Sequence, residues 1–133
     1  MADTILLVDD EEGIRKVLSI SLEDCGYRVS TAQNGEEALR IFRQVQPQIV
    51  LTDIKMPGMD GIELLQRIKE ESPDTEVIMI TGYATVEVAR EALGKGAFDF
   101  IAKPFKPNDL REVIVKAAAA LGFKGLTTFE ASK

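Results

Sequence analysis

Histidine is absent from this 133-residue chain, tryptophan is absent as well, and there is a single cysteine, Cys25. Without histidine the chain has no imidazole metal ligands, no Ser-His or Cys-His nucleophile pair, and no phosphohistidine of its own. One cysteine excludes an intramolecular disulfide and a cysteine-based zinc site. Cys25 falls near the end of a predicted helix, where we expect a small, partly buried hydrophobic residue. Carboxylates, hydroxyls and lysines therefore remain for chemistry.

Long apolar runs and an excess of positive charge are also missing. No apolar stretch approaches the ~20 residues that span a bilayer, and the N-terminus lacks a basic region followed by an apolar one. We therefore expect a cytoplasmic protein without membrane contact. A net charge of -6 argues against direct nucleic-acid contact, which needs clustered lysine and arginine. With 45% hydrophobic and 29% charged residues, the composition is typical of one globular domain.

Short apolar runs bounded by turn residues predict the strands of a parallel sheet that is buried on both faces. Such runs occupy residues 4–8, 49–53, 76–81 and 98–101. The segment 27–31 alternates and is only half apolar, which suits an edge strand. Because helical patterns separate these strands, the fold class is α/β with right-handed crossovers and helices on both faces. The edge position favours a flavodoxin-like five-stranded parallel sheet of order 2-1-3-4-5.

Helical spacing of apolar residues predicts one helix after each strand. The last helix is predicted to begin at Asn108-Asp109 and to end at Gly122. Residues 1–122 would then form one domain, and residues 123–133 a C-terminal tail or the start of a linker. The fourth helix has few large apolar residues, so we expect it to be the most mobile. Residues predicted to face inward include Val17, Val45, Val86 and Leu93.

Acidic side chains follow two of the predicted strands. Asp9 and Asp10 come directly after residues 4–8, and Asp53 ends the run 49–53. In the predicted order these strands are neighbours, and their carboxyl ends form the switch point at which ligands bind. Unit charges ~4 Å apart repel by about 4 kcal/mol at an effective dielectric near 20, so such a cluster needs a cation. Oxygen ligands without histidine or cysteine favour Mg²⁺, Mn²⁺ or Ca²⁺, and this number of carboxylates suits Mg²⁺.

Two further strand ends supply the other groups of a phosphoryl-transfer site. Thr81 offers a hydroxyl, and Lys103 offers an ammonium group suited to phosphate. Asp53 is the candidate nucleophile, because an aspartate can carry a covalent phosphoryl group. A metal ion and Lys103 would neutralise the charge on the transferring group, and no general base is required because the carboxylate is already ionised.

Together these motifs resemble the response-regulator receiver domain of bacterial two-component signalling, similar to the chemotaxis-type single-domain regulators. The resemblance covers roughly Ile5 to Leu121 and rests on motifs at five strand ends. These motifs are Asp9-Asp10, the apolar run into Asp53, Met56-Pro57-Gly58-Met59-Asp60-Gly61, Thr81-Gly82 and Lys103-Pro104-Phe105.

The resemblance implies that Asp53 accepts a phosphoryl group from a sensor histidine kinase or a phosphotransfer protein. It implies that Asp10, Asp53 and the backbone carbonyl of Lys55 bind Mg²⁺, with Asp9 helping through water. It also implies that Thr81 and the backbone around Gly82 bind the phosphoryl oxygens.

Further roles follow from the same resemblance. Lys103 would pair with the phosphoryl group, and the Lys103-Pro104 peptide bond is expected to be cis. Phe100 matches the switch aromatic, which moves inward when Thr81 shifts toward the phosphoryl group. Many relatives have tyrosine there, so switching would rest on ring packing alone. Lys55 and Tyr83 match the positions that tune the rate of dephosphorylation.

The output is described only in general terms by the resemblance. Phosphorylation would shift the fourth helix, fifth strand and fifth helix, and that face would then bind an unknown output partner or a second copy in a phosphorylation-dependent homodimer. Residues 81–85 and 96–100 resemble receivers of enhancer-binding transcription activators or hybrid kinases. The chain is therefore either a stand-alone regulator or an excised domain.

Two other functions compete with this hypothesis. An aspartyl-phosphate phosphatase would need a second acid two residues after the nucleophile, but that position is Lys55. A flavodoxin-like binder of small ligands would need a hydroxyl- or glycine-rich phosphate loop after the first strand. Residues 9–12 are all acidic there and would repel an anion.

Overall fold

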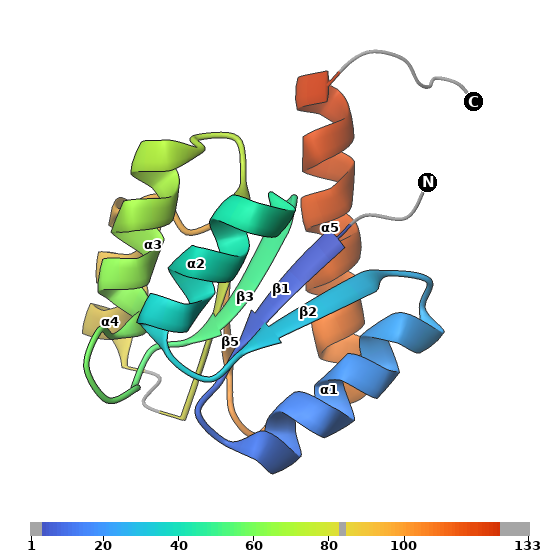
Figure 1. Cartoon of the computed structure of the whole chain (residues 1–133), viewed down its shortest axis with the longest axis horizontal. Coiled ribbons are helices and arrows are strands. Elements are labelled where there is room, and N and C mark those ends of the chain that lie inside the picture. Colours follow the sequence, from blue (N-terminus) through green and yellow to red (C-terminus); the bar gives the residue numbers. More distant parts are fainter. Residues whose placement is uncertain (1–3, 83–84, 126–133) are drawn as a thin grey trace.

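The computed structural model describes residues 4–82 and 85–125, and within these ranges five strands alternate with five helices (Figure 1). The strands are β1 (Thr4–Val8), β2 (Arg28–Ala32), β3 (Ile49–Asp53), β4 (Glu76–Thr81) and β5 (Asp99–Ala102). The helices are α1 (Glu12–Asp24), α2 (Gly35–Val45), α3 (Gly61–Glu71), α4 (Val86–Gly94) and α5 (Pro107–Gly125).

The strands form one parallel sheet of order β2-β1-β3-β4-β5, as the sequence predicts. The half-apolar strand β2 lies at one edge, and β5 lies at the other. Strands β3 and β4 are buried along their whole length. The order makes β1 and β3 neighbours, so the loops that follow them meet at the carboxyl edge of the sheet.

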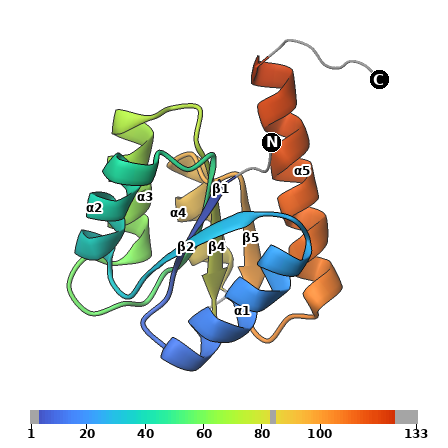
Figure 2. The same cartoon turned by 45° about the vertical axis from the view of Figure 1, so that its right-hand side comes forward.

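Helices cover both faces of the sheet, with α2, α3 and α4 on one face and α1 and α5 on the other (Figures 1 and 2). Alternate strand residues supply the two cores. Leu6 and Val50 pack on the α2–α4 face, whereas Leu7 and Leu51 pack on the α1/α5 face. Because strand side chains alternate with a period of two, Asp53 continues the Leu51 row and belongs to the α1/α5 face.

Side-chain caps fix the beginnings of three helices near this carboxyl edge. Asn34, Asp60 and Thr85 accept hydrogen bonds from the backbone amides three residues later, at 2.8, 2.9 and 3.1 Å. Each cap satisfies an amide that has no partner within the helix. The loops around the sheet edge are therefore anchored at the helix side as well as at the strand side.

The predicted beginning of α5 is wrong by one residue. The helix begins at Pro107, whose missing amide hydrogen costs nothing at the first helical position. Asp109 does not cap α5 in the expected way but accepts a hydrogen bond of 3.2 Å from the Lys106 amide. The Lys103-Pro104 bond in the preceding loop is cis, as expected.

The helix also continues past Gly122 to Gly125, since a glycine weakens a helix by about 1 kcal/mol without ending it. The rest of the predicted tail, residues 126–133, lies outside the described residues. None of the helices in the described part of the chain has both the length and the apolar character that a membrane span requires.

Four side chains predicted to face inward are exposed, namely Val17, Val45, Val86 and Leu93. Helical periodicity identifies an apolar face, but the width that the sheet covers depends on the tilt and neighbours of each helix. The prediction for Cys25 is also wrong, because this residue is exposed at the C-cap of α1.

The residue that ends α2 offers a test of how backbone conformation affects stability. Gln46 follows the helix in the left-handed conformation (φ 52°, ψ 61°), which disfavours side chains by about 1 kcal/mol. We expect Gln46→Gly to raise the free energy of unfolding by up to about 1 kcal/mol, because glycine adopts this conformation without that strain. The measurement is a pair of urea unfolding curves. As a control, Gln44→Gly inside α2 should lower the same quantity by about 1 kcal/mol, and equal effects at both positions would refute the explanation.

Candidate functional site

The carboxyl ends of β1 and β3 place two buried acids side by side. Val8 pairs with Thr52 in the sheet, so the next residues along each strand, Asp9 and Asp53, are neighbours. Asp9 is 2% exposed and Asp53 is 7% exposed. Carboxylate oxygens of Asp9, Asp10 and Asp53 all lie within 4.8 Å of one another. The topology thus concentrates negative charge at the switch point.

Lys103, from the loop between β5 and α5, bridges the two buried acids. Its Nζ lies 2.9 Å from Asp53 Oδ2 and 3.2 Å from Asp9 Oδ2. Burial lowers the pKa of Lys103, but the hydrogen bonds and charges of Asp53 and Asp9 outweigh burial, so that the pKa is raised overall. The Lys103 amide also donates to the Thr81 carbonyl oxygen at 2.8 Å. This second contact ties the lysine loop to the end of β4.

Asp53 is held through both its side chain and its backbone. Its Oδ1 accepts a hydrogen bond of 3.2 Å from the Lys55 amide. Its carbonyl oxygen accepts a bond of 2.9 Å from the hydroxyl of Thr52, which is fully buried. Gly61, at the start of α3, lies directly against that carbonyl, and a Cβ there would overlap with it. Close backbone packing therefore fixes the position of Asp53.

Asp9 has partners for its amide, its carbonyl and its carboxylate. The amide donates to Ala32 at 3.2 Å, and Oδ1 accepts from the Glu11 amide at 2.9 Å. The carbonyl accepts a short bond of 2.6 Å from Nη1 of Arg15. Sequence reasoning missed Arg15. The available signal was a cation in the first turn of a helix, where the positive end of the helix dipole disfavours it.

Asp10 leaves one side of the cluster open, because its side chain is exposed. The donors gathered at the cluster are oxygens, which suits a hard divalent cation. The cluster could therefore hold such an ion. The Lys55 amide contacts Asp53, and the Lys55 side chain is exposed. Binding of the cation by the Lys55 carbonyl oxygen stays a prediction.

The predicted switch residues lie on the opposite face of the sheet from the lysine bridge. Thr81 is fully buried at the end of β4. Phe100 is half-buried, pairs with Met79 in the sheet and packs on the α2–α4 face. By strand alternation Thr81 and Phe100 are diagonal neighbours on that face. Tyr83, the other predicted rate-tuning residue, lies outside the described residues.

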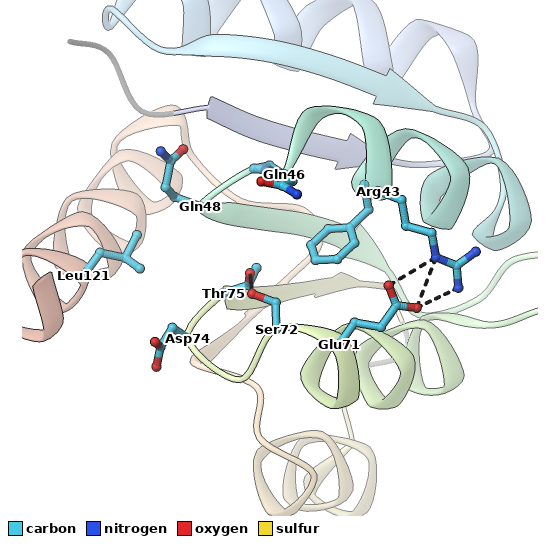
Figure 3. A pocket seen from close by; sticks show the side chains of 10 residues that line it. Arg43, Gln46, Gln48, Glu71, Ser72, Asp74, Thr75 and Leu121 are labelled. Atoms are coloured by element: carbon cyan, nitrogen blue, oxygen red, sulfur yellow. Dashed lines mark hydrogen bonds and ion pairs between the residues drawn. The ribbon is translucent and has the colours of Figure 1, made fainter.

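Two hollows accompany the site at different distances. An apolar hollow of about 510 Å³ borders Lys103, and Val17, Pro104 and Phe105 contribute to its lining. A more polar pocket of about 480 Å³ lies at the amino edge of the sheet, where Arg43 bonds Glu71 at one side (Figure 3). Of these two hollows, the apolar one adjoins the cluster of Asp9, Asp10 and Asp53 through Lys103.

The fold and the site define a flavodoxin-like α/β domain with a lysine-bridged acidic centre at its switch point. The family model for the response regulator receiver domain matches residues 5–115. The chain therefore belongs to the response-regulator receiver domain family.

Curated relatives agree with this assignment. The chain is 43% identical over 113 residues to the regulatory protein AtoC of Escherichia coli (strain K12), which covers 85% of this chain and 24% of AtoC. It is 40% identical over 116 residues to the sporulation initiation phosphotransferase F of Bacillus subtilis (strain 168), covering 87% of this chain and 94% of the relative. The chain thus spans about a quarter of the first relative and nearly all of the second.

A solved structure agrees as well. The CheY-like receiver domain protein of Methanospirillum hungatei JF-1 superimposes with a TM-score of 0.90 at 35% identity, covering 94% of this chain and all of that one. The predicted family and fold are confirmed. The chain is a phosphoacceptor signalling domain of the two-component type, a class that interacts with histidine kinases or phosphotransfer proteins. The family assignment therefore favours the receiver hypothesis over the phosphatase and the small-ligand binder.

The lysine bridge predicts a specific dependence of stability on pH. Lys103→Met in EDTA should lower the free energy of unfolding at neutral pH by about 1–3 kcal/mol, since two buried carboxylates lose their cationic partner. Folding raises the pKa of Lys103 above its ordinary value of 10.5. Wild type is therefore more stable than Lys103→Met below pH 10.5, and this difference in the free energy of unfolding shrinks as the pH rises further.

Urea unfolding of both proteins from pH 7 to 11 measures the difference. Lys106→Met, which removes an exposed lysine of the same loop, should leave the stability at neutral pH nearly unchanged. A difference between wild type and Lys103→Met that stays constant up to pH 11 would contradict the assignment of the bridge.

Proposed function

We propose that this chain accepts a phosphoryl group on Asp53 in a Mg²⁺-dependent reaction and passes on the signal through a changed surface. The observation that carries the proposal is the lysine bridge. A mostly buried carboxylate at the switch point faces a second buried acid, and one ammonium group contacts both at 2.9 and 3.2 Å. This arrangement combines a carboxylate nucleophile with an ammonium group suited to phosphate.

The oxygen donors support Mg²⁺ as the cation. Asp10, Asp53 and the backbone carbonyl of Lys55 would bind it, with Asp9 acting through water. When bound, Mg²⁺ neutralises charge on the oxygens of the transferring group. Lys103 limits the repulsion among the acids, and the exposed Asp10 leaves the centre open on one side. Mg²⁺ commonly binds through one or two carboxylates together with waters and phosphate oxygens.

The chain itself contributes the nucleophile and the groups that receive the phosphoryl oxygens. An oxygen of the Asp53 carboxylate attacks phosphorus in a phosphohistidine, and the P–N bond breaks. The imidazole retains the electron pair and takes a proton from solvent. Lys103 pairs with one phosphoryl oxygen, and the Thr81 hydroxyl donates to another. No other residue needs to remove a proton, because the attacking carboxylate is ionised. In this sense the domain catalyses its own phosphorylation and dephosphorylation.

The phosphoryl donor is proposed to be a sensor histidine kinase or a phosphotransfer protein, and the transfer is proposed to take place in the cytoplasm. One relative of nearly equal length is named as a phosphotransferase, whereas the matched part is only 24% of the regulatory protein AtoC. The chain therefore suits either a free-standing member of a phosphorelay or the receiver part of a longer regulator.

The phosphoacceptor can be tested by intact mass after incubation with acetyl phosphate and Mg²⁺. We expect one added phosphoryl group on the wild type, none on Asp53→Asn, and none in EDTA. Asparagine is the matched control because it keeps the shape of Asp53 and removes the nucleophilic charge. Label that persists on Asp53→Asn would place the acceptor elsewhere. Sustained hydrolysis of a chromogenic phosphate ester would instead favour a phosphatase.

The output face is proposed to be α4, β5 and α5. Ala92 is the buried residue of α4, while Val86 and Leu93 are exposed, so few apolar contacts hold this helix in place. Phosphorylation would draw Thr81 toward the phosphoryl group, and Phe100 beside it would move inward. That face would then bind an output partner or a second copy. Lys55 and Tyr83 are the residues proposed to set the phosphoryl lifetime.

Nuclear magnetic resonance can test this output. Beryllofluoride with Mg²⁺, a phosphoryl analogue, should shift amide signals of residues 82–106 in addition to those beside Asp53. The same additions to Asp53→Asn should leave that region unchanged. If the wild-type shifts are confined to the loops around Asp53, the proposed output face is wrong even where the acceptor is right.

A further inference from the structure

The side chain of Arg15, in the first turn of α1, contacts the acidic centre at its backbone. Arg15 is half-buried, and its Nη1 donates a hydrogen bond of 2.6 Å to the carbonyl oxygen of Asp9. Its own amide donates to the Glu11 carbonyl at 3.1 Å, which fixes the start of the helix. A cation is disfavoured at this end of a helix by the helix dipole. The bond to Asp9 offsets that unfavourable placement.

The contacted carbonyl belongs to the peptide bond between Asp9 and Asp10. Its oxygen and the Asp10 amide lie in one rigid plane, so a short charge-assisted bond to the oxygen orients the whole plane. The remaining polar groups of Asp9 are held separately, by Ala32, Glu11 and Lys103. Arg15 therefore restrains the rotation of the peptide plane between Asp9 and Asp10.

Asp10 depends on that plane for its position. Its side chain is exposed, and within residues 4–82 and 85–121 no hydrogen bond or ion pair ends on its carboxylate. Even so, a carboxylate oxygen lies within 4.8 Å of those of Asp9 and Asp53. A side chain without such partners keeps its place mainly through the backbone that carries it.

We infer that Arg15 is a positioning residue of the cation site, which holds the Asp10 carboxylate in place by fixing the Asp9–Asp10 peptide plane. The inference rests on the proposed function, since the cation is the Mg²⁺ of that reaction. Groups that orient metal ligands without touching the metal change affinity by about 10–100-fold when they are removed.

The test is the affinity for Mg²⁺ alone, measured by calorimetric titration of folded wild type and Arg15→Met. Methionine keeps an unbranched apolar stem and removes both the donor and the charge. We expect the dissociation constant to rise by about tenfold or more. The sign is informative, because the loss of a positive charge beside a dication site would tighten binding if charge were the only effect. An unchanged or lower dissociation constant would overturn the inference.

Two further variants separate positioning from charge and from stability. Arg40→Met removes the same charge from an exposed site on α2, where Arg40 Nη2 lies 3.6 Å from Glu37 Oε2. This variant should bind Mg²⁺ with the affinity of wild type. Equal weakening in both variants would overturn the inference, as would a less stable Arg15→Met with wild-type affinity. Arg15→Lys keeps the charge on a shorter stem without the planar fork. If Arg15→Met does not fold, weaker binding by Arg15→Lys supports the inference and equal binding overturns it.

Failure of the proposed function would give a different result. Wild type would then neither bind Mg²⁺ nor take the acetyl phosphate label on Asp53, and the inference would fall with it. Wild type that binds and is labelled, together with unchanged affinity in Arg15→Met, would remove the inference and leave the function standing.

Discussion

The close approach of two buried carboxylates at the ends of neighbouring strands is the constraint on which the rest of the site depends. Asp9 and Asp53 are almost fully covered by protein, and like charges at such separations repel by several kcal/mol. Lys103 relieves this repulsion by contacting both acids. Its loop is in turn tied to β4 through the Thr81 carbonyl. One ammonium group therefore links the ends of β1, β3 and the lysine loop.

The backbone of the two buried acids is held by hydrogen bonds and close packing, and the third acid of the cluster, Asp10, is exposed. Thr52 bonds the carbonyl of Asp53, Gly61 lies against it, and Arg15 bonds the carbonyl of Asp9. These contacts immobilise the backbone without using the carboxylate oxygens. The exposed Asp10 is on the open side. In a site built in this way, the sheet and the helix starts set the positions of the acids.

The helices differ in how many of their residues they bury against the sheet. Helix α3 buries five residues against the sheet, whereas α4 buries only Ala92 among its residues. On the opposite face, Val17 of α1 is exposed and lines the apolar hollow next to Lys103. Val17 thus lies next to the chemistry, and the exposed Val86 and Leu93 lie on the proposed output face.

Much of the fold and the acidic centre was accessible from the sequence, because both depend on one-dimensional patterns. Apolar runs mark the strands, the half-apolar run marks the edge, and an acid at a strand end lies at the carboxyl edge of a parallel sheet. Strand alternation places Asp9 and Asp53 on one face. Partners that are distant in sequence were decided only by the tertiary structure. The contact of Lys103 with Asp9 joins residues 94 positions apart, the role of Gly61 depends on an approaching carbonyl, and the exposure of Val17 depends on how far the sheet covers α1. Such contacts follow from the packing of whole elements in three dimensions, and no local pattern of residues encodes them.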